Sequence, residues 1–136
     1  MKINAKTDYA CRALLELALH WPKKDPLQMD VIAHKQHIPV KFLIHILIHL
    51  KQAGLVESIR GKSGGYRLSI SPKEVSIKDV VQAFDKVNIL SNSRSEVMSA
   101  LWKKIDEEVS AVVGRINFEE LANKQKEKDK FVTFDI

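Results

Sequence analysis

Apolar side chains recur at helical spacing through the first third of the chain. They return every three to four residues over residues 4–21, 29–36 and 39–53, the spacing of one buried helical face. In the third stretch the inward positions are Leu43, Ile46, Leu47 and Leu50. The pattern predicts three helices, with a proline-containing loop between the first two.

The spacing changes to alternation after Gly54, a residue that suits the left-handed end of a helix. Residues 55–59 and 66–70 alternate apolar with polar positions, which is typical of half-buried strands. Between them lies the sequence RGKSGG, which is basic, rich in glycine and free of acidic residues. A helix followed by a basic hairpin is the plan of a winged helix.

Two further helices are expected in the second half. Ser76 and Asp79 resemble a capping box before a short helix that ends near Phe84. Residues 95–114 then carry an apolar stripe that is too long to be buried against a small core of four helices. We expect this helix to pack on a second copy of the chain; packing back on its own domain is the alternative. The stripe consists of Val97, Met98, Leu101, Trp102, Ile105, Val109, Val112 and Val113.

The end of the chain is expected to carry little structure. Residues 118–124 suit a short turn of helix, and the charged run that follows suggests a flexible tail over 125–136. The sequence therefore predicts a mainly α fold with a small β-hairpin. Its parts are a winged helix-turn-helix domain (1–87), a loop and dimerisation helix (88–124), and the tail.

Charge is unevenly distributed along the 136 residues. Residues 1–75 carry 12 Lys and Arg against 6 Asp and Glu, whereas residues 76–136 carry 10 against 11. The excess positive charge therefore lies with the predicted helix and hairpin, where a polyanion such as DNA would be met. No stretch is apolar enough to span a membrane and no signal-peptide pattern is present, so we expect a cytoplasmic protein. The single cysteine, Cys11, excludes an internal disulfide.

Several segments together resemble one known family. They are TDYACRALLELA, IPVKFLIHILIHLKQAGLV, IRGKSGGYRLS and VSIKDVVQAFD. These segments are similar to the IscR/NsrR/CymR family of bacterial winged-helix transcription regulators. The likeness is close over residues 1–87 and looser over 95–123, where that family has its dimerisation helix and a short terminal helix.

The resemblance implies a cytoplasmic homodimer, most often a repressor, that binds a palindromic operator in double-stranded DNA. The third helix would enter the major groove, with base-facing or phosphate-facing positions at Lys41, Phe42, Ile44, His45 and His49. The wing would reach the adjacent minor groove. There Arg60 would enter the groove, and Lys62, Ser63 and the amides of Gly64 and Gly65 would hold phosphates. The simpler role for the two glycines is a tight hairpin tip.

Some positions depart from the family pattern. Many relatives have Glu and Gln where this chain has Ile44 and His45, so its operator should differ from theirs. Ile44 and Ile48 lie outside the inward stripe, and either contact thymine methyl groups or pack against the first helix. His45 and His49, with His34 and His37 nearby, allow a metal site or surface and phosphate-facing roles; we expect no metal.

The cofactor of the family is expected to be absent. Cluster-bearing relatives hold an iron–sulfur cluster with three cysteines between the fourth helix and the dimerisation helix. The corresponding stretch here, DKVNILSNSRSEVMSALW, has no cysteine. Asp8, at the position of an extra ligand in some relatives, is then a surface acid. Cys11 is either a small core or interface residue or a redox-sensing thiol.

Two other functions remain open at this stage. The cysteine-metabolism branch of the family acts in a complex with cysteine synthase, which binds partner tails ending in isoleucine; Ile136 is similar to such an end. The chain could instead be a dimeric scaffold that has lost DNA binding. An enzyme is not expected, because no catalytic triad, acid pair or phosphate loop can be assembled from the sequence.

Overall fold

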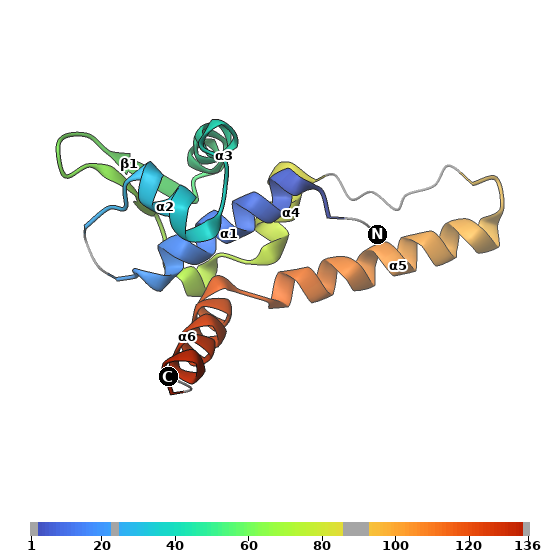
Figure 1. Ribbon diagram of the computed structural model, residues 1–136. Coiled ribbons are helices and arrows are strands. Elements are labelled where there is room, and N and C mark those ends of the chain that lie inside the picture. The colour runs from blue at the N-terminus through green and yellow to red at the C-terminus, as the bar shows by residue number, and fades with distance from the viewer. Residues whose placement is uncertain (1–2, 23–24, 86–92, 135–136) are drawn as a thin grey trace.

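The computed structural model describes residues 3–22, 25–85 and 93–134 (Figure 1). Its elements, in chain order, are α1 (Ala5–Leu19), α2 (Met29–Gln36), α3 (Val40–Gln52), β1 (Val56–Ile59), β2 (Gly65–Leu68), the 3-10 helix η1 (Pro72–Glu74), α4 (Ile77–Phe84), α5 (Glu96–Arg115) and α6 (Phe118–Phe134). The prediction of a mainly helical chain with one small hairpin is confirmed. None of the helices in these ranges is long and apolar enough to cross a membrane.

The core forms where α1 crosses α2, α3 and α4. The predicted inward face of α3 is buried, with Leu43, Leu47 and Leu50 fully covered and Ile46 only 2% exposed. From α1, Ala10, Ala13 and Leu14 meet this face, and small alanines let the two helices approach closely. The hydrophobic spacing read from the sequence therefore located the core correctly.

The hairpin is slightly shorter than predicted and is extended on one side. β1 and β2 are antiparallel, with Val56 opposite Leu68 and Ile59 opposite Gly65. Leu27, in the loop before α2, pairs with Tyr66 through two backbone hydrogen bonds, Leu27 N to Tyr66 O at 2.8 Å and Tyr66 N to Leu27 O at 2.7 Å. β2 is thus bonded along both edges near its start.

The turns and caps follow local chemistry. Asn4 caps α1 by accepting a hydrogen bond from the amide of Thr7, and Ser76 with Asp79 forms the predicted capping box of α4. Gly54 has φ +78°, as expected for the residue after α3. His37, between α2 and α3, is also left-handed at φ 53°, a conformation that glycine adopts at lower cost.

The C-terminal segment differs from the prediction. We expected a turn of helix over 118–124 and a flexible tail from residue 125, but α6 continues to Phe134. Asn117 and Glu120 cap its start reciprocally, each side chain accepting from the other's amide. Phe118 and Ala122 lie in the core, 1% and 3% exposed, so α6 begins in the same core as the winged domain. The charged run then continues the helix, since its residues are good helix formers.

The helix α5 lies apart from this core. It has no buried residue, and apart from its contact with α4 it extends away from the other elements (Figure 1). Its N-terminus is capped by Ser95, which accepts a hydrogen bond from the amide of Met98. The apolar side chains of this 20-residue helix are exposed or only half-buried, so it lacks much of the packing that stabilises helices in most proteins.

Candidate nucleic-acid interface

The outer face of α3 is bounded by contacts along its two sides. On one side the ring of Phe42 stacks on Tyr9 of α1, with centroids 6.0 Å apart, and His49 packs on Phe84 of α4 at 4.6 Å. On the other side the Nζ of Lys51 donates to the Oγ of Ser58 in β1 at 2.8 Å. The strip between these sides turns away from the core, as the burial of the opposite face requires.

Three predicted base-facing residues lie in this exposed strip. Lys41, Ile44 and His45 are all exposed, and so is Ile48. Packing of the two isoleucines against the first helix, one of the two roles left open, is therefore not what the structure has. Phe42 and His49, also predicted to face DNA, are exposed as well but lie at the border with α1 and α4, where their rings contact Tyr9 and Phe84.

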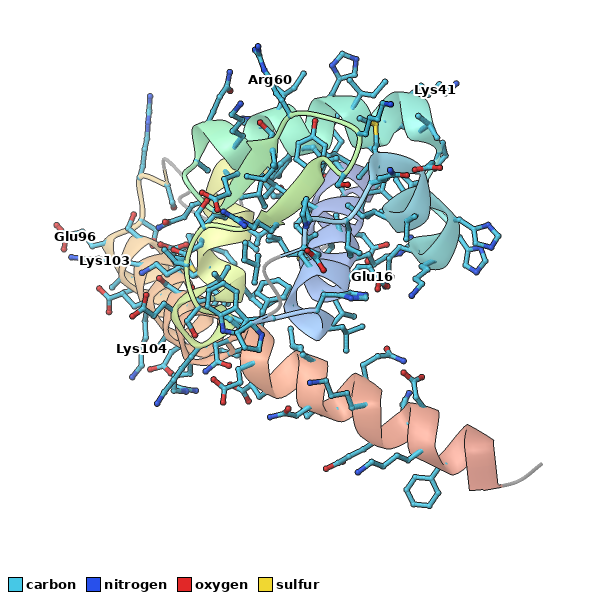
Figure 2. The ribbon with its side chains drawn as sticks, turned by 90° about the vertical axis from the view of Figure 1, so that its left-hand side faces the viewer. Glu16, Lys41, Arg60, Glu96, Lys103 and Lys104 are labelled. Carbon is cyan, nitrogen blue, oxygen red and sulfur yellow. The ribbon has the colours of Figure 1, made fainter. Side chains whose placement is uncertain are left out.

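The wing carries its cations on the same side of the molecule. Arg60, Lys62 and Ser63 are exposed at the tip of the hairpin. Figure 2 shows Arg60 and Lys41 projecting from one common edge, whereas Lys103 and Lys104 of α5 lie elsewhere. The residues predicted from two separate segments are therefore brought together on one surface.

The two wing glycines have steric roles. A Cβ on Gly64 would lie 2.2 Å from the carbonyl oxygen of Ile59, and a Cβ on Gly65 would lie 2.2 Å from that of Leu27. The amide of Gly64 donates to the carbonyl of Gly61 at 3.0 Å, so it is engaged within the turn. These facts favour the tight hairpin tip over direct phosphate binding for Gly64.

A network of hydrogen bonds from α1 holds the turn between α2 and α3 in place. The sequence analysis did not predict this network. The guanidinium of Arg12 donates to the carbonyl oxygens of Gln36 and His37, and it pairs with Asp8 at 3.1 Å. The buried carboxylate of Glu16 accepts from Gln36 Nε2 at 2.9 Å. The carbonyls at the end of α2 and in the left-handed turn thus gain partners.

The same carboxylate has a second partner, the Nε2 of His20 at 3.1 Å, so each of its two oxygens is hydrogen-bonded. The only sequence signal for this network is that Arg12 and Glu16 share a helix face with residues of the core. Their partners lie 20 to 25 residues away, which no local pattern reveals.

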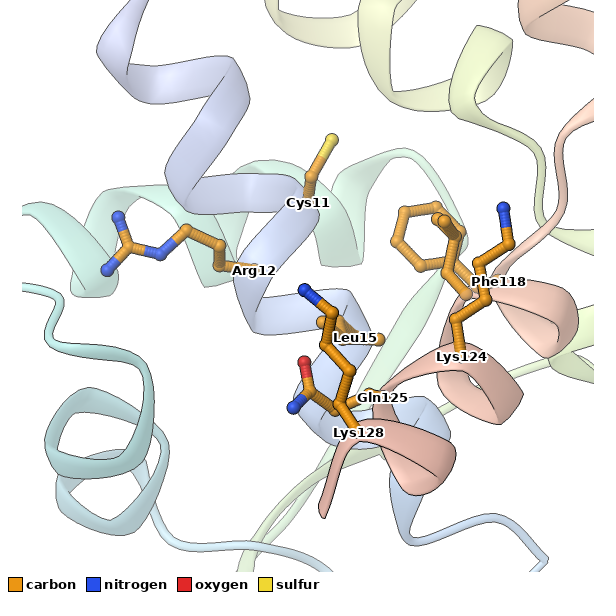
Figure 3. Close-up of a pocket in the computed structure, with 8 residues that line it drawn as sticks. Cys11, Arg12, Leu15, Phe118, Lys124, Gln125 and Lys128 are labelled. Atoms are coloured by element: carbon orange, nitrogen blue, oxygen red, sulfur yellow. The ribbon is translucent and has the colours of Figure 1, made fainter. Parts of the chain in front are cut away.

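The thiol of Cys11 lies beside a cavity between α1 and α6. The cavity has a volume of about 290 Å³ (Figure 3) and is lined by Cys11, Arg12, Leu15, Phe118, Leu121, Lys124, Gln125 and Lys128. Burial, and secondarily the nearby charge of Asp8, raises the pKa of the Cys11 thiol from 9.0 to about 11. A thiol with such a pKa is protonated and unreactive at neutral pH.

The donors needed for an iron–sulfur cluster are not brought together. A cluster requires several thiolates, and the chain has one cysteine. Within residues 3–22, 25–85 and 93–134, no group of three His, Cys, Asp or Glu side chains is placed to hold a metal ion. Part of the stretch that corresponds to the relatives' ligand loop, residues 86–92, and Ile136 at the chain end lie outside the described residues.

Comparison with known proteins identifies the family. A family model described as "Rrf2: Iron-dependent Transcriptional regulator" matches residues 3–124. The chain belongs to the Rrf2 family. The resemblance to IscR, NsrR and CymR regulators is thereby confirmed, and the protein is a DNA-binding transcription regulator rather than an enzyme.

The individual relatives agree with this assignment. The HTH-type transcriptional regulator IscR of Aliivibrio salmonicida is 30% identical over 130 residues, which are 89% of this chain and 77% of that protein. An rrf2-like HTH-type regulator of Rhodobacter capsulatus is 46% identical over 85 residues, 61% of this chain and only 57% of that relative. The higher identity is thus confined to a shorter matched segment.

Solved structures show the same winged-helix fold. CymR, the global cysteine regulator of B. subtilis, superposes with a TM-score of 0.82 at 28% identity, covering 91% of this chain and 98% of that one. IscR of T. potens gives 0.81 at 25% identity, covering 94% and 90%. The Rrf2 fold therefore extends through α5 and into α6, beyond the winged domain alone.

Proposed function

We propose that this Rrf2 protein is a homodimeric repressor in which each copy reads one half of a palindromic operator. The observation that supports this most directly is the common surface of α3 and the wing, where Lys41 and Arg60 project from one edge of the molecule (Figure 2) and Lys62 is exposed in the same hairpin tip as Arg60. α3 would lie in a major groove and the wing would follow the phosphates into the neighbouring minor groove. A repressor needs no more than this, because a bound dimer blocks the promoter by occupancy.

The dimer is supported by the uncovered face of α5. At 100° per residue, the eight apolar side chains predicted for the interface fall within an arc of about 160°. Of these, Val97 is 78% exposed, Val112 46% and Leu101 44%. A second α5 packed along this face would cover them, and it would set the separation of the two reading surfaces.

We further propose that the regulator acts without an iron–sulfur cluster. The family description mentions iron, but a chain with a single cysteine does not supply the thiolates that a cluster requires. Protein purified without oxygen, with iron and sulfide supplied, should therefore lack the visible absorption of a cluster. It should also bind operator DNA equally well before and after treatment with a chelator.

The test of DNA binding starts with selection of bound fragments from genomic DNA and footprinting of the protected site. We expect two protected half-sites about one helical turn apart and an affinity that falls steeply with salt. Lys62→Ala should lower the slope of log affinity against log salt by about 1, the contribution of one phosphate contact.

The matched control is Lys103→Ala, which removes the same charge from an exposed position on α5, away from the α3 and wing surface (Figure 2). It should leave the slope unchanged. Equal effects of the two substitutions, or an affinity that does not depend on salt, would contradict the proposed surface.

A further inference from the structure

The exposed strip of α3 carries an unusual apolar stripe. Val40, Ile44 and Ile48 follow one another at four-residue intervals and are 48%, 40% and 49% exposed. They run obliquely from the wing side of the helix to its outermost face, since four residues advance the helix by slightly more than one turn. Contiguous exposed apolar side chains of this kind indicate a contact surface.

The surroundings of the stripe favour DNA over a protein as its occupant. No acidic residue occurs between Asp30 and Glu57, and Lys41 and His45 flank the isoleucines on the outer face. Arg60 of the wing adds positive charge on the same side (Figure 2), and Lys62 is exposed two residues further along the hairpin tip. An apolar stripe on a helix that has no acidic residue and carries exposed cations is complementary to a polyanion.

The chemistry of α3 also restricts which bases it can read. Adenine is read by Asn or Gln and cytosine by Glu or Asp, but α3 has no carboxylate and its single amide, Gln52, is its last residue. Guanine can accept from Lys41 or His45. The apolar side chains of α3 have no hydrogen-bonding group, and the base feature that they can contact in the major groove is the C5-methyl group of thymine.

We propose that Val40, Ile44 and Ile48 select the operator by packing against thymine methyl groups in each half-site. This inference rests on the proposed placement of α3 in the major groove and names the sequence chemistry that it recognises. Val40 and Ile48 are eight residues apart, which is about 12 Å of helix and corresponds to roughly three to four base-pair steps. Each half-site should then contain thymines clustered over that length.

The test uses the full-length protein and the operator obtained by fragment selection. Each thymine in a half-site is replaced singly by deoxyuridine, which keeps every hydrogen-bonding group and removes only the methyl. At contacted positions we expect the affinity to fall about threefold to fivefold for each methyl lost. At thymines outside the half-site core, the ratio of the affinities for the thymine and deoxyuridine operators should stay near one.

Protein variants identify the side chains that make the contact. Ile48→Ser and Ile44→Ser each change an exposed position and leave no methyl group to contact thymine, so folding should be preserved and each should abolish the deoxyuridine effect at its own thymine. Ile3→Ser is the matched control, because Ile3 is equally exposed at 48% but lies before α1. This control should discriminate between thymine and deoxyuridine operators as strongly as the wild-type protein does.

The outcomes separate the two proposals. If the operator binds with the expected salt dependence but no thymine shows a methyl effect, the stripe does not read DNA and a protein groove is its occupant; this overturns the inference alone. If no genomic fragment is bound at all, the proposed function fails as well. A methyl effect that survives both isoleucine variants also overturns the inference.

Discussion

Cys11 shows how a single residue's surroundings decide its chemistry. The sequence left open a redox-sensing thiol, but the position beside the α1–α6 cavity buries the sulfur and raises its pKa to about 11. Only the thiolate attacks oxidants and alkylating agents. The structure therefore favours the packing role over sensing.

The first prediction concerns that thiol. At pH 8 a pKa of about 11 leaves about one thiolate in a thousand, against one in ten for an unperturbed thiol. Alkylation of native Cys11 by iodoacetamide, followed by mass spectrometry, should be about a hundredfold slower than that of the urea-unfolded chain, and should rise with pH up to about 11. Equal rates in the two states would show that burial does not protect the sulfur.

The second prediction concerns Gly64. An alanine there places a Cβ 2.2 Å from the Ile59 carbonyl, so the turn must open and the wing tip must move. DNA affinity should fall at least tenfold, while the melting temperature should change little because the tip lies outside the core. Gel-shift titration and calorimetry measure the two quantities.

The control for that variant is Gly114→Ala in α5, where the added Cβ meets only the Lys78 side chain at 3.6 Å. Its helix should gain about 0.5–1 kcal/mol, as an exposed helical glycine replaced by alanine does. A Gly64→Ala variant with wild-type DNA affinity would show that the wing geometry is not needed for binding.

At the level of elements, the sequence predicted the helices that have an apolar face and failed on the one that does not. The stripe of α3, the capping box of α4 and the span of α5 were all placed correctly, because each leaves a local signal. The second half of α6 was missed, because it was judged by its charge alone. The high helix propensity of its Lys, Glu and Gln residues was the signal that could have found it.

Contacts between distant elements were beyond local patterns. The network of Arg12 and Glu16 with the end of α2 joins residues 20 to 25 apart. The same holds for the exposure of the α3 surface, since Ile44 and Ile48 could equally have packed on α1 by periodicity alone. Only the crossing geometry of the two helices decides which side chains remain uncovered.

The third prediction separates the two halves of α6. Phe118→Ala should destabilise the fold by about 3–5 kcal/mol, because it empties a fully buried position. Ending the chain after Lys128 should cost less than about 1 kcal/mol, since Asp129, Lys130 and Phe131 are exposed. Urea unfolding of both variants checks this, and a large loss on truncation would mean that the end of α6 packs on something.

At the level of the whole molecule, α5 is the element that a single chain does not explain. In the chain it connects α4 to α6, which both contribute to the core, yet none of its own residues is buried. A helix this long is marginal in water without tertiary packing. The proposed dimer supplies that packing.

The fourth prediction tests this arrangement. Leu101→Glu introduces a charge within the apolar arc of α5, so it should convert the dimer to a monomer and lower operator affinity more than tenfold. Light scattering after size exclusion gives the mass. Lys103→Glu, on the opposite side of α5, is the matched control and should remain dimeric; a monomeric wild-type protein would refute the arrangement.

The two backbone hydrogen bonds between Leu27 and Tyr66 have a mechanical consequence. They join β2 of the wing to the residues that lead directly into α2. α2 is joined in turn to α3 by the turn at His37, whose carbonyl oxygen accepts from Arg12. These bonds restrain the wing from tilting relative to α3, so we expect operators whose curvature does not match the two elements to bind more weakly.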